Sequence, residues 1–189
     1  MSFKWADKYQ RASLDRINSS VGYVPGNIRY VCQTANWVKW KFRDEDVFRF
    51  CAAASHWNRD FSVLKEIDTV PFLRYLHLAS RRAREKKRPF DLTAEYLMDI
   101  WNKQGGRCAL SGIPLDNPPN SVWDDYYCHP WRASLDRIDS SLSYVKGNVQ
   151  FLCMMGNFGK NTSSNESLVS FCKAVSGKMV DPLGVAPKS

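Results

Sequence analysis

Residues 132–161 combine a compact set of metal-type polar side chains with the pattern of a hairpin and a short helix, RASLDRIDSSLSYVKGNVQFLCMMGNFGKN. The carboxylate and carboxamide side chains of this stretch include Asp136, Asn148 and Asn157, and oxygen ligands of this kind suit a hard divalent cation. We therefore expect this stretch to form the active site.

Two strands and a helix must position these residues. Residues 134–138 (SLDRI) alternate loosely between apolar and polar side chains, as a short strand does, and the loop after them contains the turn residues Gly147 and Asn148. Residues 149–153 (VQFLC) form a β-branched and aromatic run typical of a strand. Residues 154–161 suit one or two helical turns. The predicted order is strand, loop, strand, helix.

The run SLDRIDSSLSYVKGNVQFLCMMGNFGK, from Ser134 to Lys160, resembles the HNH nucleases. The fold of that family, called ββα-metal, holds one divalent cation between two strands and a helix. The resemblance implies that Asp136 and Asn157 bind the metal, Mg²⁺ or Mn²⁺, and that Asn148 ties the loop by side-chain hydrogen bonds. Upstream, QGGRCALSGIPL at residues 104–115 is similar to the lead-in of the family, so that the resemblance covers residues 91–175.

The sequence departs from the family at the general base. The family places a histidine directly after the metal-binding residue, whereas this chain has Arg137. A guanidinium stays protonated at physiological pH, so it is poorly suited to take a proton. We expect Arg137 to orient water or to neutralise phosphate charge. Proton transfer is assigned to His129 or to solvent.

A second departure concerns zinc. Relatives often carry paired Cys-x-x-Cys knuckles, but the corresponding pairs here lack one cysteine each, at Ser111 and Gly156. Cys108, Cys128, His129 and Cys153 flank the predicted hairpin and are of types that tetrahedral zinc accepts. Because half of each knuckle is missing, we expect no structural zinc.

The composition predicts a globular protein with a polyanionic partner. The 189 residues carry a formal net charge of +8, which favours nucleic acid, although many basic proteins bind none. Six cysteines without a signal peptide suggest reduced thiols. No run approaches the roughly 20 apolar residues of a membrane span. These features predict an intracellular, cytoplasmic protein.

Residues 11–39 are a copy of residues 132–160. The two runs align without a gap at an offset of 121, and 16 of the 29 positions are identical. A repeat of this length is a whole supersecondary unit, so we infer an internal duplication. The copy retains four residues of the candidate site: Asp15, Arg16, Asn27 and Asn36.

Two interpretations of the copy stay open. It is either a second nuclease centre, one for each DNA strand, or a degenerate remnant kept for packing or DNA contact. We favour the remnant, because the copy has Lys8 where the second unit has His129 and has no counterpart of the lead-in at 104–115. A cleft that lacks one wall holds its ligands less rigidly.

A basic segment separates the two copies. Residues 70–87 have helical spacing and then turn strongly basic, and Thr93 is placed to cap a second helix. The charged run suits a solvated helix end, but next to a nuclease-like unit it also suits a ridge that binds phosphates. We expect DNA contacts from this run and from the end of the last motif: Arg81, Arg82, Arg84, Lys86, Lys87, Arg88 and Lys160.

The sequence thus predicts an α+β protein with two ββα-metal units. Residues 1–54 form a degenerate N-terminal repeat, 55–106 a helical basic connector, 107–175 the catalytic unit, and 176–189 a tail. The expected function is metal-dependent hydrolysis of DNA by an endonuclease, with a homodimer needed to cut both strands if the first unit is inactive. The alternative is a DNA-binding protein that has lost catalysis on the same scaffold.

Overall fold

The computed structural model describes residues 11–59, 72–117 and 129–179. Within these residues the protein is a mixed α+β structure with six helices and two small antiparallel sheets of two strands each. The predicted α+β class is therefore confirmed. No helix in the described ranges is long and apolar enough to cross a bilayer.

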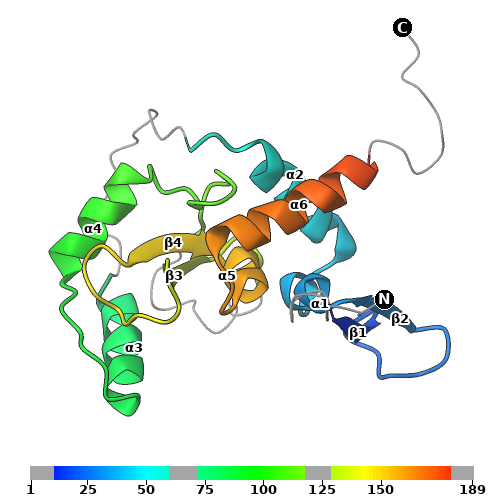
Figure 1. Ribbon diagram of the computed structural model, residues 1–189, viewed down its shortest axis with the longest axis horizontal. Helices are drawn as coiled ribbons and strands as arrows, with labels where there is room; N and C mark the ends of the chain where they lie inside the picture. The colour runs from blue at the N-terminus through cyan, green and yellow to red at the C-terminus, as the bar shows by residue number, and fades with distance from the viewer. Residues whose placement is uncertain (1–10, 60–71, 118–128, 180–189) are drawn as a thin grey trace, which may run out of the picture.

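The chain runs through two units of like order with a pair of helices between them (Figure 1). The first unit consists of β1 (Ala12–Arg16), β2 (Ile28–Cys32), α1 (Gln33–Lys39) and α2 (Asp44–His56). The intervening helices are α3 (Phe72–Glu85) and α4 (Ala94–Lys103). The second unit consists of β3 (Ala133–Arg137), β4 (Val149–Cys153), α5 (Met154–Lys160) and α6 (Asn165–Met179).

The strand registers of the two units correspond position by position. Ala12 pairs with Cys32 in the first hairpin, and Ala133 pairs with Cys153 in the second. The short helices also end alike, at Trp40 (φ 43°) and Asn161 (φ 50°), which are both left-handed. The offset of 121 seen in the sequence therefore holds for the pairing of the strands and for the helix ends.

Helices of the two units pack directly on each other at the centre of the molecule. The helix α2 lies against α6, and α1 lies against α5. The contact between α1 and α5 is close at Gly159, because a Cβ added there would lie 2.4 Å from Cγ2 of Val38. At the edge of this contact the rings of Trp40 and Phe158 lie 4.6 Å apart. The two hairpins point away from this helical core (Figure 1).

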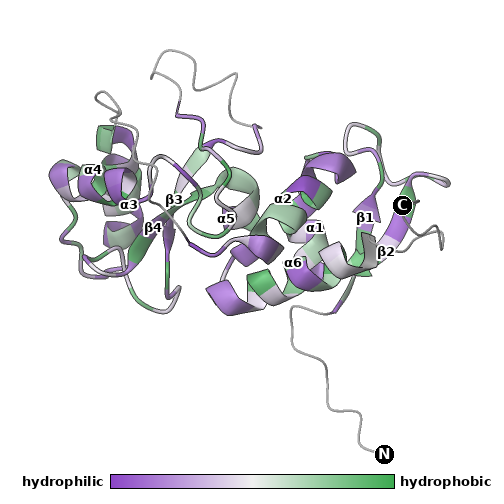
Figure 2. Cartoon of the chain, turned by 90° about the horizontal axis from the view of Figure 1, so that it is seen from above, coloured by the Kyte–Doolittle hydropathy of each residue, from purple (hydrophilic) through white to green (hydrophobic). Residues whose placement is uncertain are grey.

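Among the described residues, the second hairpin has a cover of helices that the first hairpin lacks. The ring of Phe151 on β4 contacts Phe72 and Tyr75 of α3 and Trp101 of α4, with centroids 5.2–5.9 Å apart. Figure 2 places α3 and α4 at the end of the molecule opposite β1 and β2. The residue of β2 that corresponds to Phe151 is Tyr30, which is 83% exposed. The two units thus have the same hairpin in different surroundings.

Gln104, the first residue of the predicted lead-in at 104–115, holds the edge of β4 by side-chain hydrogen bonds. The side chain of Gln104 accepts a hydrogen bond from the backbone N–H of Phe151 (2.9 Å) and donates to its carbonyl (2.9 Å). The first bond gives the N–H of Phe151 at the open edge of β4 a partner, and the second adds to the bond that the carbonyl of Phe151 accepts from the N–H of Ala109 at 3.0 Å. The helix that precedes Gln104 begins as expected, since the hydroxyl of Thr93 accepts from the N–H of Tyr96 at 3.2 Å.

Candidate nucleic-acid interface

A basic groove runs between α3 and the β3–α5 face of the second unit. Its volume is about 410 Å³. Four arginines line it, namely Arg74, Arg81, Arg82 and Arg132, together with Ser134, Tyr144 and Asn157. None of the described residues that line it is acidic. A concave surface lined by charges of one sign attracts a polyanion, although Arg81 also lies 3.7 Å from the carboxylate of Glu85, which offsets part of its charge.

Asn157 lies on the wall of this groove. It projects from the first turns of α5, and its amide nitrogen donates to Oγ of Ser134 on β3 at 2.6 Å. This bond fixes the orientation of the carboxamide, so the amide oxygen is the atom left to accept a cation or a donor from a ligand. Asn157 therefore lines the groove with its carboxamide oriented by Ser134, and its role as a metal ligand stays a prediction.

Asp136 lies at the same β3–α5 contact, two residues after Ser134 on the strand. Residues two apart on a strand share a face, and residues three apart on a helix are neighbours, so the pair Asp136–Lys160 follows the pair Ser134–Asn157. The carboxylate of Asp136 is 3.3 Å from Nζ of Lys160 and accepts from Nε2 of Gln150 at 2.9 Å. Asp136 and Asn157 are thus on the same side of the hairpin, each with its own partner.

The residues around Asp136 do not fit a metal site as they stand. Asp136 is 5% exposed and Lys160 is 0% exposed, so the carboxylate faces a buried ammonium rather than the groove. Burial raises the pKa of Asp136, and the charge of Lys160 and the Gln150 hydrogen bond oppose this rise. In the described ranges no cluster of three His, Cys, Asp or Glu residues could hold a metal ion.

Arg137, the last residue of β3, faces the opposite side of the strand from Asp136, and its side chain binds the hairpin loop. Its Nη1 donates to the carbonyls of Ser140 (2.8 Å) and Leu142 (2.9 Å), and its guanidinium lies 5.3 Å from the ring centre of Tyr144. Asn148 closes the same loop, since it accepts from the N–H of Asp139 and donates to the carbonyls of Asp139 and Ser143. The loop is therefore held rigidly by two side chains.

The predicted DNA-binding residues separate into three groups. Arg81 and Arg82 line the basic groove, and Lys86 and Arg88 line a pocket that adjoins it. Arg84 and Lys87 are exposed on the same segment but line neither cavity. Lys160 does not reach the surface. Its ammonium donates to the carbonyl of Arg137 at 2.7 Å inside the unit, so the expected DNA contact of Lys160 does not hold in this structure.

His129 lies away from the groove. Its Nδ1 is 2.9 Å from Oδ2 of Asp116, and neither residue lines the groove or the adjoining pocket. Of the cysteines considered for zinc, Cys108 and Cys153 are buried next to each other in the core, and Cys128 lies outside the described residues.

The first unit repeats the same side-chain arrangement. Nζ of Lys39 is 3.3 Å from Asp15 and 2.6 Å from the carbonyl of Arg16, and Asn36 donates to Oγ of Ser13 at 2.8 Å. Asn27 closes its loop through Asn18, Val21 and Gly22, as Asn148 does in the second unit. In addition Arg29 bridges Asp15 to Asp44.

Several lining residues were not predicted from the sequence. Arg74 is one, although its spacing of seven and eight residues from Arg81 and Arg82 places all three on one helical face, which was a usable signal. Ser143, Tyr144 and Arg132 are others. Their place in the lining depends on how α3 lies across the hairpin, and no local pattern reveals that.

No family model matches the chain, and no curated protein or solved structure is significantly similar to it.

Proposed function

We propose that this protein acts on DNA and that the basic groove holds the phosphodiester backbone. The observation that carries the proposal is the set of four arginines around Asn157, with no acidic residue among the described residues that line the groove. Each phosphate that an arginine neutralises releases counterions from the DNA, which favours binding without regard to sequence. Arginine also matches phosphate geometry with its paired N–H donors.

We further propose that the protein is an endonuclease of the HNH type, with Mg²⁺ or Mn²⁺ as its metal. The resemblance from Ser134 to Lys160 supports this, as does the repeated order of two strands and a helix with corresponding registers. In this proposal the units at 11–39 and 132–160 are duplicated ββα-metal units. Asn157 would orient a phosphate in the groove, and Arg137 would neutralise phosphate charge in the adjoining pocket.

The second candidate function is DNA binding without cleavage. It is favoured by the pairing of Asp136 with Lys160, because a carboxylate that faces a buried ammonium is not free to bind a cation. The same pairing in the first unit, between Asp15 and Lys39, favours a structural role for both carboxylates. Cleavage would require Lys160 to leave Asp136 when DNA is bound.

One pair of assays separates these functions. Binding is measured by fluorescence anisotropy with a labelled duplex, and cleavage by nicking of supercoiled plasmid with Mg²⁺ or Mn²⁺. The double change Arg74→Gln and Arg81→Gln should weaken binding, because both arginines line the groove. Arg43→Gln, a change on the exposed surface at the start of α2, should have no effect.

Asn157→Ala tests the endonuclease. It should abolish nicking and leave DNA affinity unchanged, while Asn36→Ala, the same change in the first unit, should leave both unchanged. If the wild-type protein binds DNA but does not nick it with either metal, the endonuclease proposal fails and the binding function remains. Absence of DNA binding at low salt contradicts both.

A further inference from the structure

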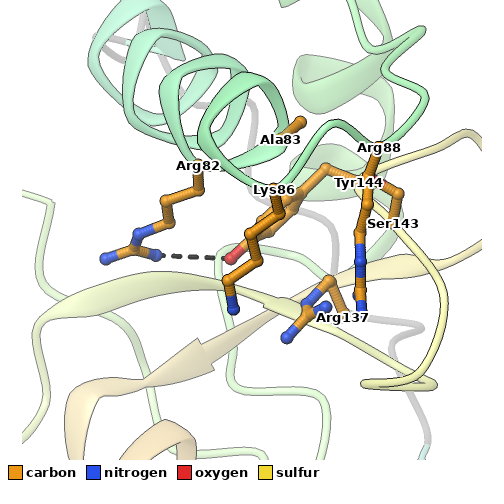
Figure 3. Close-up of a pocket in the computed structure, with 7 residues that line it drawn as sticks. All are labelled: Arg82, Ala83, Lys86, Arg88, Arg137, Ser143 and Tyr144. Atoms are coloured by element: carbon orange, nitrogen blue, oxygen red, sulfur yellow. Dashed lines mark hydrogen bonds between the residues drawn. The ribbon is translucent and has the colours of Figure 1, made fainter.

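A second cavity opens beside the basic groove, between the end of α3 and the loop of the β3–β4 hairpin. It is about 210 Å³ in volume and is lined by Arg82, Ala83, Lys86, Arg88, Arg137, Ser143 and Tyr144. We call it the arginine pocket. It shares Arg82 and Tyr144 with the groove, so the two cavities adjoin each other. Figure 3 shows the charged ends of its side chains gathered below α3, with Tyr144 between them.

The pocket concentrates four positive charges, and its described lining contains no acidic residue. The three guanidiniums are held by uncharged partners. Arg137 donates to two loop carbonyls, Arg88 donates to the carbonyl of Leu142 at 3.3 Å, and Arg82 donates to the hydroxyl of Tyr144 at 3.3 Å. Such partners orient a guanidinium without cancelling its charge, so each keeps N–H donors for an anion.

Ser143 gives an independent sign of a ligand. It lines the pocket and is only 5% exposed, and its buried hydroxyl makes no hydrogen bond within the described part of the chain. A buried hydroxyl without a partner costs free energy, and such groups in folded proteins call for an explanation. Because this oxygen is closed off from solvent, a phosphate oxygen in the pocket would accept from it only after the Ser143 side chain has turned.

We propose that the arginine pocket binds a single phosphate group of a nucleic acid strand. Arg137 and Arg88 supply charged donors from the loop side and the α3 side, Lys86 adds charge, and Ser143 donates from below. Arg137 therefore contacts phosphate and takes no proton. This inference deepens the proposed function and rests on it for the rest of the ligand. The phosphate is either the terminal monoester of a strand or an internal phosphodiester.

Inorganic phosphate is the first probe, because it tests the pocket without DNA. Titration of the full chain is followed by NMR of the arginine Nε–H and backbone amide signals, with chloride at equal ionic strength as the control. We expect signals of Arg137, Arg88 and Ser143 to shift. Arg137→Gln and Lys86→Gln should each weaken binding by about tenfold or more, since each removes a charge from an oxyanion site. Ser143→Ala should weaken it less.

Arg16→Gln is the matched control. Arg16 corresponds to Arg137, donates to the carbonyl of Ser19, and lies 5.2 Å from the ring of Tyr23, but it belongs to the uncovered hairpin. Lys86 is exposed, so its replacement leaves the fold intact even if Arg137→Gln disturbs the loop. Phosphate binding that is absent, or unchanged in both Arg137→Gln and Lys86→Gln, overturns the inference.

Two duplexes identify the source of the phosphate. If a duplex with 5′-phosphates binds more tightly than the same duplex with 5′-hydroxyls, and Arg137→Gln removes the difference, the ligand is a terminal monoester. If both bind equally and Arg137→Gln weakens both, it is an internal phosphodiester. DNA binding that is unaffected by the pocket variants contradicts the inference but leaves the proposed function standing. If the pocket binds phosphate but the protein does not bind DNA, the proposed function is contradicted, while the phosphate site itself stands.

Discussion

At the scale of single residues, a buried acid and a buried lysine recur in both units. Asp136 with Lys160 and Asp15 with Lys39 each join a strand to the following short helix at 3.3 Å. In each case the lysine also donates to the carbonyl of the arginine that follows the acid. The lysine therefore serves two acceptors at the end of the strand. Removal of Lys160 takes the counter-charge from the buried Asp136, whereas Asp15 would keep its ion pair with Arg29 if Lys39 were removed.

A double-mutant cycle measures this pairing. Asp136→Asn and Lys160→Met should each lower the free energy of unfolding by about 3–5 kcal/mol, because each leaves one buried charge unpaired. The double variant should recover most of the loss, since no unpaired charge remains. Urea denaturation followed by circular dichroism gives the four values. Single variants as stable as the wild type would show that Asp136 is not tied to Lys160, as a metal ligand would require.

The sequence placed Asp136 on a strand and Asn157 on the following short helix, but it did not predict that Asp136 forms an ion pair with Lys160. The spacing between Asp136 on a strand and Asn157 on a helix follows from the order of the elements, and both are found on the β3–α5 contact. The choice of partner depends on burial. Lys160 appears in the sequence as one more cation, and only the packing of α5 between the hairpin and α1 makes it fully buried.

At the scale of elements, the short helices depend on close contact rather than on length. The seven residues of α5 are too few to be stable alone, so α5 is held by β3, β4 and α1. Gly159 permits the last contact, because the space that a Cβ would fill is taken by Val38. The corresponding residue of α1 is Val38 itself, so the two helices fit by pairing a small residue with a larger one.

Gly159→Ala should destabilise the protein by about 1–3 kcal/mol, because the added methyl overpacks the contact between α1 and α5. Gly177→Ala is the control. This position lies on α6 with nothing within 4 Å of an added Cβ, so the change should be neutral or stabilise by about 0.5–1 kcal/mol through helix propensity. Thermal unfolding compares the two. A Gly159→Ala protein as stable as Gly177→Ala would contradict the packing.

The elements themselves were mostly predictable. Residue patterns placed the strand of residues 149–153, found at Val149–Cys153, and the strand 134–138, found one residue earlier. Thr93 was correctly predicted as a cap. What local patterns could not give is the way α3 crosses the second hairpin. That placement comes from Phe72 and Tyr75 packing on Phe151, contacts between residues far apart in the chain.

At the scale of the whole molecule, the two units differ in electrostatics although they share their strand registers. The connector places α3 over β3, and the face formed by Leu14, Ile28 and Tyr30 on the first hairpin stays exposed. The arginines of α3 thus join Arg132 and Arg137 of the second unit to form the groove and the pocket.

This distribution of charge predicts a steep dependence of DNA affinity on salt. If about five phosphates are neutralised, the affinity should fall roughly a few hundredfold between 50 and 200 mM salt. The double change Arg74→Gln and Arg81→Gln should flatten the slope of log affinity against log salt by about two contacts. Anisotropy titrations at four salt concentrations give the slopes. Equal slopes for the two proteins would place the contacts elsewhere.

The location of α3 on one hairpin also gives the bound protein a direction. A duplex has two backbones that run in opposite senses, and a molecule with its groove at one end meets them unequally. One chain would then sit on a single backbone with its bare hairpin always to the same side. To contact both backbones in the same way, a second copy of the chain would have to bind in the opposite orientation.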